Sequence, residues 1–423
     1  MHYFQYKNGK LHAKDLPVEA LAREYGTPLY IYSATTLKRH YRAFDSAFAG
    51  IPHLTCYSVK ANSNLSLLRI LAREGAGTDI VSDGELFRAL RAGVPPEKIV
   101  YSGVGKKTGE IQEALLAGIL MFNVESAQEL ERINAVAGEM DKVARISLRI
   151  NPDVDPKTHP YISTGLKENK FGLSRSEALE TYALALKLPH VDPVGLDCHI
   201  GSQLTQLSPF LEALERLKAF HGQLADMGVR IRYLDLGGGL GITYDEEEPP
   251  HPADLGKALV EALQDMDVTL ILEPGRVIAG NTGILVTEVQ YTKTNEGKNF
   301  VIVDAGMNDL IRPSLYGSYH RIAPVRERGG AEILADVVGP ICESSDFLAK
   351  NRSLPPVAQG DLLAAFSAGA YGFVMSSQYN SRPRAAEVMV EGDRHVLVRG
   401  RETYNELLAL EEAGLSSISA LEG

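Results

Sequence analysis

Short apolar, β-branched runs alternate with longer amphipathic segments through the first two thirds of the chain. The runs are LTCYSV (54–59), TDIVS (78–82), KIVYS (98–102), LMFNV (120–124), VARISLRI (143–150), VGLDCHI (194–200), IRYLDL (231–236) and TLILE (269–273). Each has the length and composition of a buried strand. Between them, segments such as NLSLLRILAREG (64–75) repeat apolar residues at three and four positions and end at glycine, which predicts helices.

This alternation predicts parallel strands joined by crossover helices, and eight such strands predict an α/β fold of the TIM-like (β/α)8 barrel type. An open, doubly wound sheet is the alternative that the pattern alone leaves open. After residue 276 the chain alternates apolar and polar residues at period two, as in AEVMV and RHVLV on either side of a turn at Gly392. This second part predicts an antiparallel β-domain, a sandwich or a barrel. We therefore expect a barrel over 36–276 and a β-domain over 277–423, joined by the strand-like residues 1–35.

Composition narrows the class of protein. The 423 residues are 44% hydrophobic, which is enough for two domains, and no run of eighteen apolar residues predicts a membrane span. The N-terminus has no apolar segment typical of a secretion signal, and the three cysteines form no CxxC pair, so we expect a reduced, cytoplasmic protein. The net charge of −11 argues against nucleic acid and acidic membranes as partners. We expect no metal site.

Unusual polar residues follow the predicted strands. Lys60 follows the first strand, Arg149 lies near the end of the fifth, His199 closes the sixth, Gly237–Gly239 follow the seventh and Glu273 ends the eighth. Taken singly, the histidine, the arginine and the glutamate would fit ordinary structural roles. In a (β/α)8 barrel, however, active sites lie at the carboxyl ends of the strands. The five positions together therefore indicate a binding site.

The residue types suggest pyridoxal phosphate as cofactor. The sequences LGGGLG and EPGR occupy the loops after the seventh and eighth strands, where such barrels bind phosphate. The dinucleotide motif GxGxxG is not matched, because Ile242 stands at its third glycine. Lys60 would attach the cofactor covalently, Glu273 would pair with the pyridine nitrogen, and His199 would stack on the ring.

The ordered motifs YSVKAN, CHIGSQ, LDLGGGLG, LEPGR, GPICESSD and GAYG, spread over residues 25–390, carry a family resemblance. The chain resembles the barrel-type pyridoxal-phosphate decarboxylases of basic amino acids, and among them the diaminopimelate decarboxylases. The resemblance implies decarboxylation of meso-2,6-diaminopimelate to L-lysine and carbon dioxide, the last step of lysine biosynthesis. It also implies a homodimer.

The resemblance implies roles residue by residue. For the cofactor, it makes Lys60 the attachment point and His199 the stacking residue, and Glu273 pairs with the ring nitrogen. The remaining cofactor residues that it implies are Ser202, Gly237, Gly238, Gly239, Gly275, Arg276 and Tyr371, with Asp79 and Arg149 in a second layer. The substrate residues that it implies are Arg276, Arg312, Tyr316, Glu343 and Tyr371.

Cys342 is implied to protonate the α-carbon, acting with Glu343 in the partner subunit's site. Read without the resemblance, Cys342 could instead be a small buried residue. The alternatives for the function are an ornithine or arginine decarboxylase on the same scaffold and a non-catalytic protein that binds pyridoxal phosphate. Glu343 stands where those decarboxylases usually carry aspartate. The segment 151–172 could form a mobile lid or an ordered connection.

Overall fold

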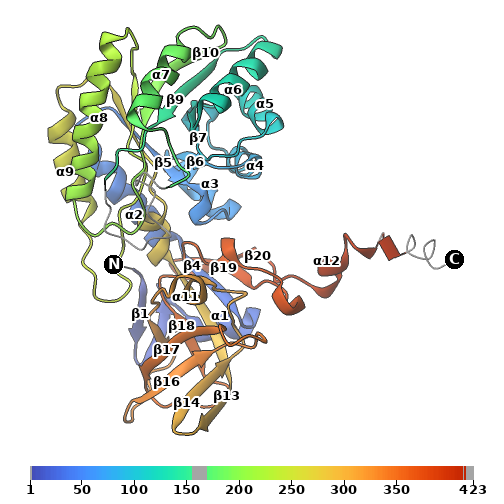
Figure 1. Cartoon of the computed structure of the whole chain (residues 1–423). Helices are drawn as coiled ribbons and strands as arrows, with labels where there is room; N and C mark the ends of the chain where they lie inside the picture. The colour runs from blue at the N-terminus through green and yellow to red at the C-terminus, as the bar shows by residue number, and fades with distance from the viewer. Residues whose placement is uncertain (1, 155–168, 413, 416–423) are drawn as a thin grey trace. The chain divides into compact units, whose positions relative to one another are not determined.

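The computed structural model describes residues 2–154, 169–412 and 414–415, which belong to two compact units (Figure 1). The first unit consists of residues 37–279, and the second combines residues 1–36 with residues 280–423. The central part of the expected lid, residues 155–168, lies outside the described residues. No helix in the described parts of the chain is long and apolar enough to cross a membrane.

The first unit contains a closed barrel of eight parallel strands. In chain order these are β5 (His53–Ser58), β6 (Gly77–Ile80), β7 (Ile99–Tyr101), β8 (Met121–Val124), β9 (Ala144–Arg149), β10 (Val191–Asp197), β11 (Tyr233–Asp235) and β12 (Thr269–Leu272). Each strand pairs with the next along the chain, and β12 returns to β5. The expected (β/α)8 barrel is confirmed, and the open sheet is excluded because β12 and β5 close the ring.

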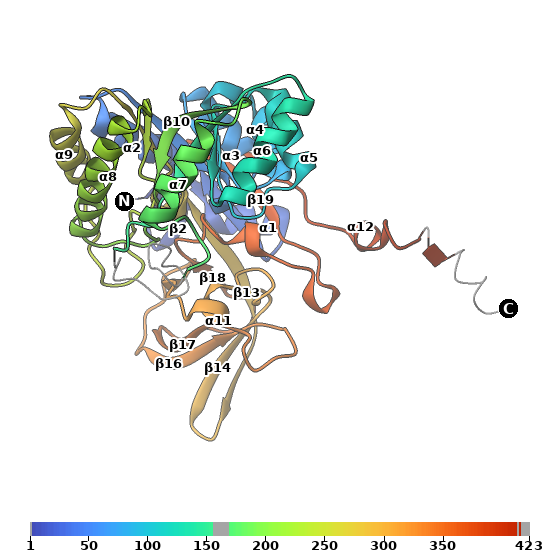
Figure 2. The same ribbon diagram turned by 45° about the horizontal axis from the view of Figure 1, so that its top comes forward.

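Helices cover the outside of the barrel. They are α2 (Ala34–Asp45), α3 (Leu65–Arg73), α4 (Asp83–Ala92), α5 (Thr108–Ala117), α6 (Ala127–Glu139), α7 (Arg175–Ala185), α8 (Ser208–Asp226) and α9 (Pro252–Leu263). A single turn, α10 (Arg276–Ala279), follows β12. Local sequence sets their ends. In α4, for example, the Ser82 hydroxyl caps the first turn and Gly93 ends the helix in the left-handed conformation. Figure 2 shows α8 and α9 side by side on one side of the barrel, with α4 and α5 on the opposite side.

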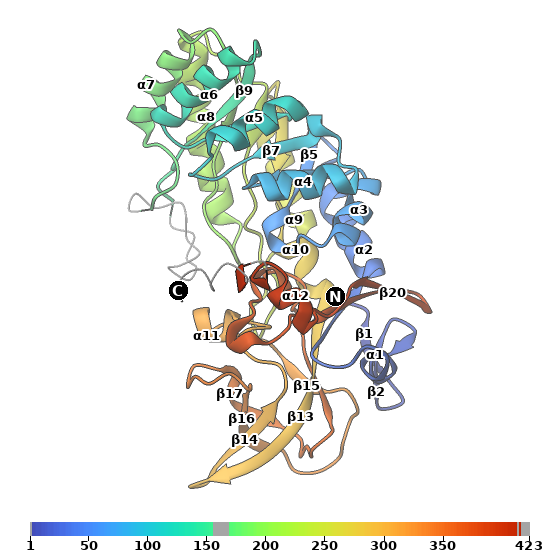
Figure 3. The same cartoon turned by 90° about the vertical axis from the view of Figure 1, so that its right-hand side faces the viewer.

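The second unit is built on a nine-stranded sheet. Its strands are β4 (Leu29–Ser33), β13 (Gly283–Asn295), β14 (Lys298–Val303), β15 (Ile322–Pro324), β16 (Ile333–Val338), β17 (Phe347–Leu354), β18 (Leu362–Ala365), β19 (Ala386–Glu391) and β20 (Arg394–Arg399). The order is β17-β16-β14-β13-β4-β19-β20, with β18 pairing with β13 and β15. In Figure 3, β13 and β14 run together as a long ribbon. Short elements complete the unit: β1 (Phe4–Lys7), β2 (Lys10–Ala13), β3 (Leu16–Pro17), α1 (Val18–Tyr25), α11 (Arg312–Tyr316) and α12 (Tyr404–Leu408).

The expectation of an antiparallel domain is wrong for two strand pairs. β4 pairs with β19 in parallel, and β14 pairs with β16 in parallel. Parallel pairing needs a long connection, and both pairs have one. The whole barrel and most of the sheet separate β4 from β19, while a segment containing α11 and β15 joins β14 to β16. The sheet is therefore mixed.

Candidate active site at the carboxyl ends of the barrel strands

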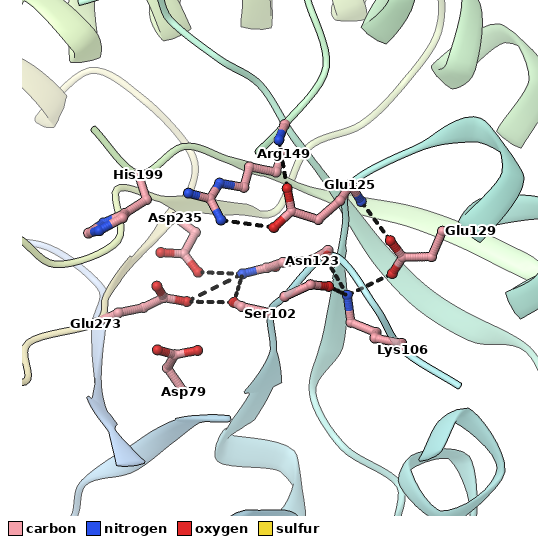
Figure 4. Close-up of polar contacts among 12 residues, drawn as sticks. Asp79, Ser102, Lys106, Asn123, Glu125, Glu129, Arg149, His199, Asp235 and Glu273 are labelled. Atoms are coloured by element: carbon pink, nitrogen blue, oxygen red, sulfur yellow. Dashed lines mark hydrogen bonds and ion pairs between the residues drawn. The ribbon is translucent and has the colours of Figure 1, made fainter. Parts of the chain in front are cut away.

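Every barrel strand supplies at least one buried polar residue in its last two positions or directly after it. In strand order these residues are Ser58, Asp79, Ser102, Asn123, Arg149, Asp197, Asp235 and Glu273. We call this set the polar ring; Figure 4 shows most of its members converging. Buried polar groups are costly unless they are hydrogen-bonded, so the arrangement calls for mutual partners or a ligand.

Lys60 and Asp79 form an ion pair on the polar ring. Lys60 lies in the short 3-10 turn Val59–Ala61 that follows β5, and its Nζ donates to Asp79 Oδ2 at 2.6 Å. The Ser58 hydroxyl lies 2.8 Å from the same oxygen. Asp79 is fully buried, whereas the Lys60 side chain remains 39% exposed. The lysine amine is thus held in place at the barrel end while staying accessible.

Glu273 follows β12 and is held by neutral donors. Its Oε1 accepts from Ser102 Oγ at 3.2 Å and from Asn123 Nδ2 at 3.3 Å. Burial, followed by the charges of Asp235 and Asp79, raises the pKa of Glu273 well above its usual range. A cation beside this carboxyl would stabilise its ionised form, and a protonated pyridine nitrogen is such a cation. The position therefore fits pyridoxal phosphate.

The polar ring holds more acids than bases. Arg149 Nη1 donates to the buried Glu125 Oε1 at 2.8 Å, so this cation is already matched by a carboxylate beside the ring. Burial, then the charge of Glu273, raises the pKa of Asp197, and burial, then Asp197, raises the pKa of Asp235 to about 8. No group of three or more His, Cys, Asp or Glu side chains within the described residues could hold a metal ion. Because the pKa values of Asp197 and Asp235 are raised, protons neutralise part of this group of acids near pH 7.

His199 lies just beyond β10 with a defined tautomer. The backbone N–H of Gly238 donates to His199 Nδ1 at 3.2 Å, so this nitrogen carries no proton. Burial, followed by the charges of Arg149 and Lys60, lowers the pKa of His199 well below its usual range. The imidazole is neutral at pH 7, which suits a ring that stacks on an aromatic cofactor.

The glycine turn after β11 requires glycine. A Cβ on Gly238 would lie 2.2 Å from the Glu273 carbonyl oxygen, and Gly239 has a φ of +115°. The N–H groups of Gly237 and Gly238 donate to Asp235 Oδ1 and His199. Within the described chain, the amides of Gly239 and Gly275 have no such acceptor. Of the four glycines that the resemblance assigned to the cofactor, Gly239 and Gly275 therefore keep amides available to a phosphate.

Arg276 is anchored at the start of α10. Its Nη1 donates to the Tyr244 hydroxyl at 2.7 Å and its Nη2 to Ser202 Oγ at 3.1 Å. The guanidinium also lies 5.7 Å from the centre of the Tyr244 ring. Ser202 and Arg276, which the sequence placed at the cofactor, thus contact each other, and Tyr244 was not expected there.

The other five predicted residues belong to the β-sheet unit: Arg312, Tyr316, Cys342, Glu343 and Tyr371. Arg312 and Tyr316 begin and end α11, and Tyr371 has a left-handed φ of 54°. Arg312 is buried, and its Nη1 lies 2.8 Å from Nε2 of His320. The other ring nitrogen of His320 lies 2.8 Å from the Phe366 carbonyl oxygen. His320 therefore donates to that carbonyl and accepts from Arg312.

Cys342 and Glu343 lie on an exposed loop whose base is fixed by Asp346. Asp346 accepts the N–H groups of Met307 and Ile341, each at 2.6 Å. The Cys342 N–H donates to Asn380 Oδ1 at 3.0 Å. The thiol of Cys342 is exposed, unlike the buried Cys56 and Cys198. This exposure argues against a purely structural role.

Glu343 receives hydrogen bonds from two hydroxyl groups. The Tyr379 hydroxyl contacts Oε1, and Ser345 Oγ lies 2.9 Å from Oε2. These contacts lower the pKa of Glu343, so the residue carries a negative charge at neutral pH.

Sequence reasoning missed five members of the polar ring: Ser58, Ser102, Asn123, Asp197 and Asp235. A usable signal was present, since Asn123 and Asp235 each interrupt or end an apolar strand run. Asp197 does the same in GLDCHI. Side chains alternate between the two faces of a strand, so a buried polar residue that interrupts an apolar run near the carboxyl end of a barrel strand is a candidate for the site.

Comparisons with known proteins agree with this architecture. Residues 34–280 match the family described as "Pyridoxal-dependent decarboxylase, pyridoxal binding domain". The chain is 57% identical over 413 residues to a diaminopimelate decarboxylase of Haemophilus influenzae, covering 97% of this chain and 99% of the relative. It is 56% identical over 413 residues to that of Vibrio cholerae, with the same coverage.

A solved structure is similar over almost the same length. The Helicobacter pylori diaminopimelate decarboxylase, crystallised in complex with L-lysine, superposes with a TM-score of 0.91 at 47% sequence identity. The match covers 94% of this chain and 99% of that one. The chain belongs to the pyridoxal-dependent decarboxylases, in the diaminopimelate decarboxylase family.

Proposed function

We propose that this protein catalyses the pyridoxal-phosphate-dependent decarboxylation of meso-2,6-diaminopimelate to L-lysine and carbon dioxide. The observation that carries the proposal is the pairing of Lys60 with Asp79 on the same buried polar ring as Glu273. A lysine for covalent attachment and a carboxyl for the ring nitrogen are the two groups that this cofactor needs most. The L-lysine in the Helicobacter pylori relative supports the choice of product.

Pyridoxal phosphate, when bound, withdraws electrons from the substrate α-carbon and so stabilises the charge left when carbon dioxide departs. Lys60 would attach it, and the Gly239 and Gly275 amides would bind its phosphate, helped by the backbone of Arg276 and the hydroxyl of Tyr371. Glu273 would keep the ring nitrogen protonated. The neutral imidazole of His199 would cover one ring face.

The remaining residues would orient the substrate and move one proton. Arg276, held by Ser202 and Tyr244, presents a planar guanidinium suited to a carboxylate. The Cys342 thiol would deliver the proton that replaces carbon dioxide at the α-carbon. We infer that Cys342 and Glu343 act in the site of a second copy, which makes the active form a homodimer.

Arg312, with Tyr316, would bind the carboxylate at the distal end of the substrate, and Glu343 would bind the distal ammonium. A decarboxylase acting on ornithine has no distal carboxylate to recognise. A site that buries an arginine for such a group would therefore discriminate against ornithine.

The direct test supplies cofactor-loaded protein with meso-diaminopimelate, ornithine, arginine and lysine in parallel and measures carbon dioxide. Release from diaminopimelate alone is expected. Release from ornithine or arginine would overturn the assignment of Arg312 and Glu343 but not of the cofactor. No release from any substrate would favour a non-catalytic protein that binds pyridoxal phosphate.

The shared site has its own test. Lys60→Ala and Cys342→Ala are each expected to be inactive, yet their mixture should form dimers with one intact site. About a quarter of wild-type activity should return after subunit exchange. An inactive mixture of subunits that demonstrably exchange would place Cys342 in its own subunit's site.

A further inference from the structure

Asn123 contacts three other members of the polar ring. It is fully buried near the end of β8, and its Nδ2 has three polar neighbours (Figure 4). Ser102 Oγ lies at 3.1 Å, Asp235 Oδ2 at 3.2 Å and Glu273 Oε1 at 3.3 Å. The two carboxyl groups thus meet at one amide nitrogen.

The chemistry of the amide nitrogen defines the direction of these contacts. An amide nitrogen only donates, so both carboxyl oxygens accept from Asn123. The Ser102 hydroxyl donates to the same Glu273 Oε1. Two neutral donors therefore engage Oε1, which fixes the plane of the carboxyl group and leaves Oε2 as the oxygen available to a ligand.

Asp235 extends this arrangement to the glycine turn. Its Oδ1 accepts the Gly237 N–H at 2.9 Å, while its Oδ2 accepts from Asn123. A continuous set of hydrogen bonds thus runs from Gly237 through Asp235 and Asn123 to Glu273. It links the turn proposed to bind phosphate with the carboxyl proposed to meet the pyridine nitrogen.

We propose that Asn123 and Ser102 are positioning residues that fix Glu273 with Oε2 directed at the cofactor's ring nitrogen, and that Asp235 couples this carboxyl to the glycine turn. This inference rests on the proposed function for the identity of the cofactor. It adds residues that touch neither cofactor nor substrate and act through Glu273.

The competing explanation is that Asn123 only satisfies buried polar groups and stabilises the barrel. Exchanging the amide of Asn123 with the carboxyl group of Asp235 distinguishes the two explanations. In the double variant Asn123→Asp with Asp235→Asn, an amide and a carboxyl still face each other and the formal charge is unchanged. The donor to Glu273, however, becomes a carboxyl group.

The experiment uses cofactor-loaded protein and compares Asn123→Asp, the double variant, Ser102→Ala and the control Asn134→Asp. Asn134 lies on α6 and accepts from the His190 N–H, which an aspartate can also do. The readouts are the absorbance maximum of the bound cofactor, its dependence on pH, the dissociation constant for pyridoxal phosphate, the melting temperature, and kcat and KM.

We expect Asn123→Asp to shift the absorbance of the bound cofactor and to lower kcat about 10-fold to 100-fold, with KM changed far less. The double variant should regain the melting temperature but neither the absorbance nor kcat. Asn134→Asp should match wild type in every readout.

Recovery of absorbance and kcat in the double variant would overturn the proposal in favour of a purely structural link, as would wild-type absorbance in Asn123→Asp.

Should Asn123→Asp fail to fold, Ser102→Ala decides, because it removes one donor to Oε1. An absorbance shift supports positioning, and an unchanged spectrum overturns it. The absorbance of the bound cofactor is measured without substrate, so an absorbance shift in an enzyme that does not decarboxylate diaminopimelate would refute the proposed reaction alone. A wild-type protein that binds no pyridoxal phosphate would refute both.

Discussion

Nζ of Lys60 and Oδ2 of Asp79 lie 2.6 Å apart, because Lys60 follows β5 and Asp79 lies on the neighbouring strand β6. The carboxylate is buried and the lysine is part-exposed, so the pair holds the amine without enclosing it. This geometry yields the first prediction. Lys60→Ala should fold normally but lose the visible absorbance of the lysine-bound cofactor. Lys98→Ala, at the opposite end of the strands, is the control and should keep it.

The glycine turn should not tolerate even one methyl group. In Gly238→Ala the new Cβ would lie 2.2 Å from the Glu273 carbonyl oxygen, which cannot move without disturbing the Glu273 side chain. We expect a destabilisation of about 1–3 kcal/mol and a clear loss of affinity for pyridoxal phosphate. Gly105→Ala has no atom within 4 Å of the added group and should behave as wild type. Chemical denaturation and cofactor titration measure both effects.

Cys342 should be the cysteine that alkylating reagents modify in the folded protein. Its thiol is exposed, whereas burial raises the pKa of the Cys56 and Cys198 thiols well above the usual range. Mass spectrometry should find one modification, absent in Cys342→Ser. The same variant should lose about 100-fold in kcat, since the proposed proton donor is gone. Full activity of the modified protein would remove Cys342 from the mechanism.

His320 should set the substrate affinity through Arg312. His320→Asn keeps a donor for the Phe366 carbonyl but is too short to accept from Arg312, whereas His320→Gln can still reach the guanidinium. We expect KM for diaminopimelate to rise about 10-fold in the asparagine variant, with a smaller change in kcat. The glutamine variant should stay closer to wild type. Equal KM values in both variants would argue against this role.

Stability should fall as pH rises because of Asp235. Its pKa lies near 8 in the folded protein against an ordinary 3.8, so the folded state binds the proton more tightly than the unfolded state. Between these values each such proton costs up to about 1.4 kcal/mol per pH unit. Asp235→Asn should flatten this slope. Urea unfolding of the cofactor-free protein between about pH 5 and 8 measures it, and parallel curves would contradict the assignment.

The barrel could be predicted from the sequence because its strands are short, apolar and bounded by helical segments. All eight were located to within a few residues of their observed ends. In the second unit the signal is weaker: in β17, Lys350, Asn351 and Arg352 interrupt the apolar pattern. The parallel pairing of β4 with β19 has no local signal, because its two halves lie at opposite ends of the chain.

Lys60 and Glu273 stood out in the sequence, whereas the neutral members of the site, Asp197 and Asp235 did not. A lysine or a glutamate directly after an apolar strand run is conspicuous because these residue types are rarely buried without a partner. Asn123 and Ser102 are single neutral residues whose importance comes from the carboxyl groups beside them. Likewise, the sequence suggested Arg149 but could not identify Glu125 as its partner.

The inner strand β4 lies near the start of the chain, but both strands that pair with it come much later in the sequence. It pairs with β13 on one side and with β19 on the other, and the whole barrel is encoded between β4 and β13. During translation the barrel, being contiguous, can close while the apolar strand Leu29–Ser33 still waits for both neighbours. A ribosome that stops before Ala386 leaves one edge of β4 open to other chains. β19 therefore closes an edge of β4 that would otherwise favour pairing with other chains.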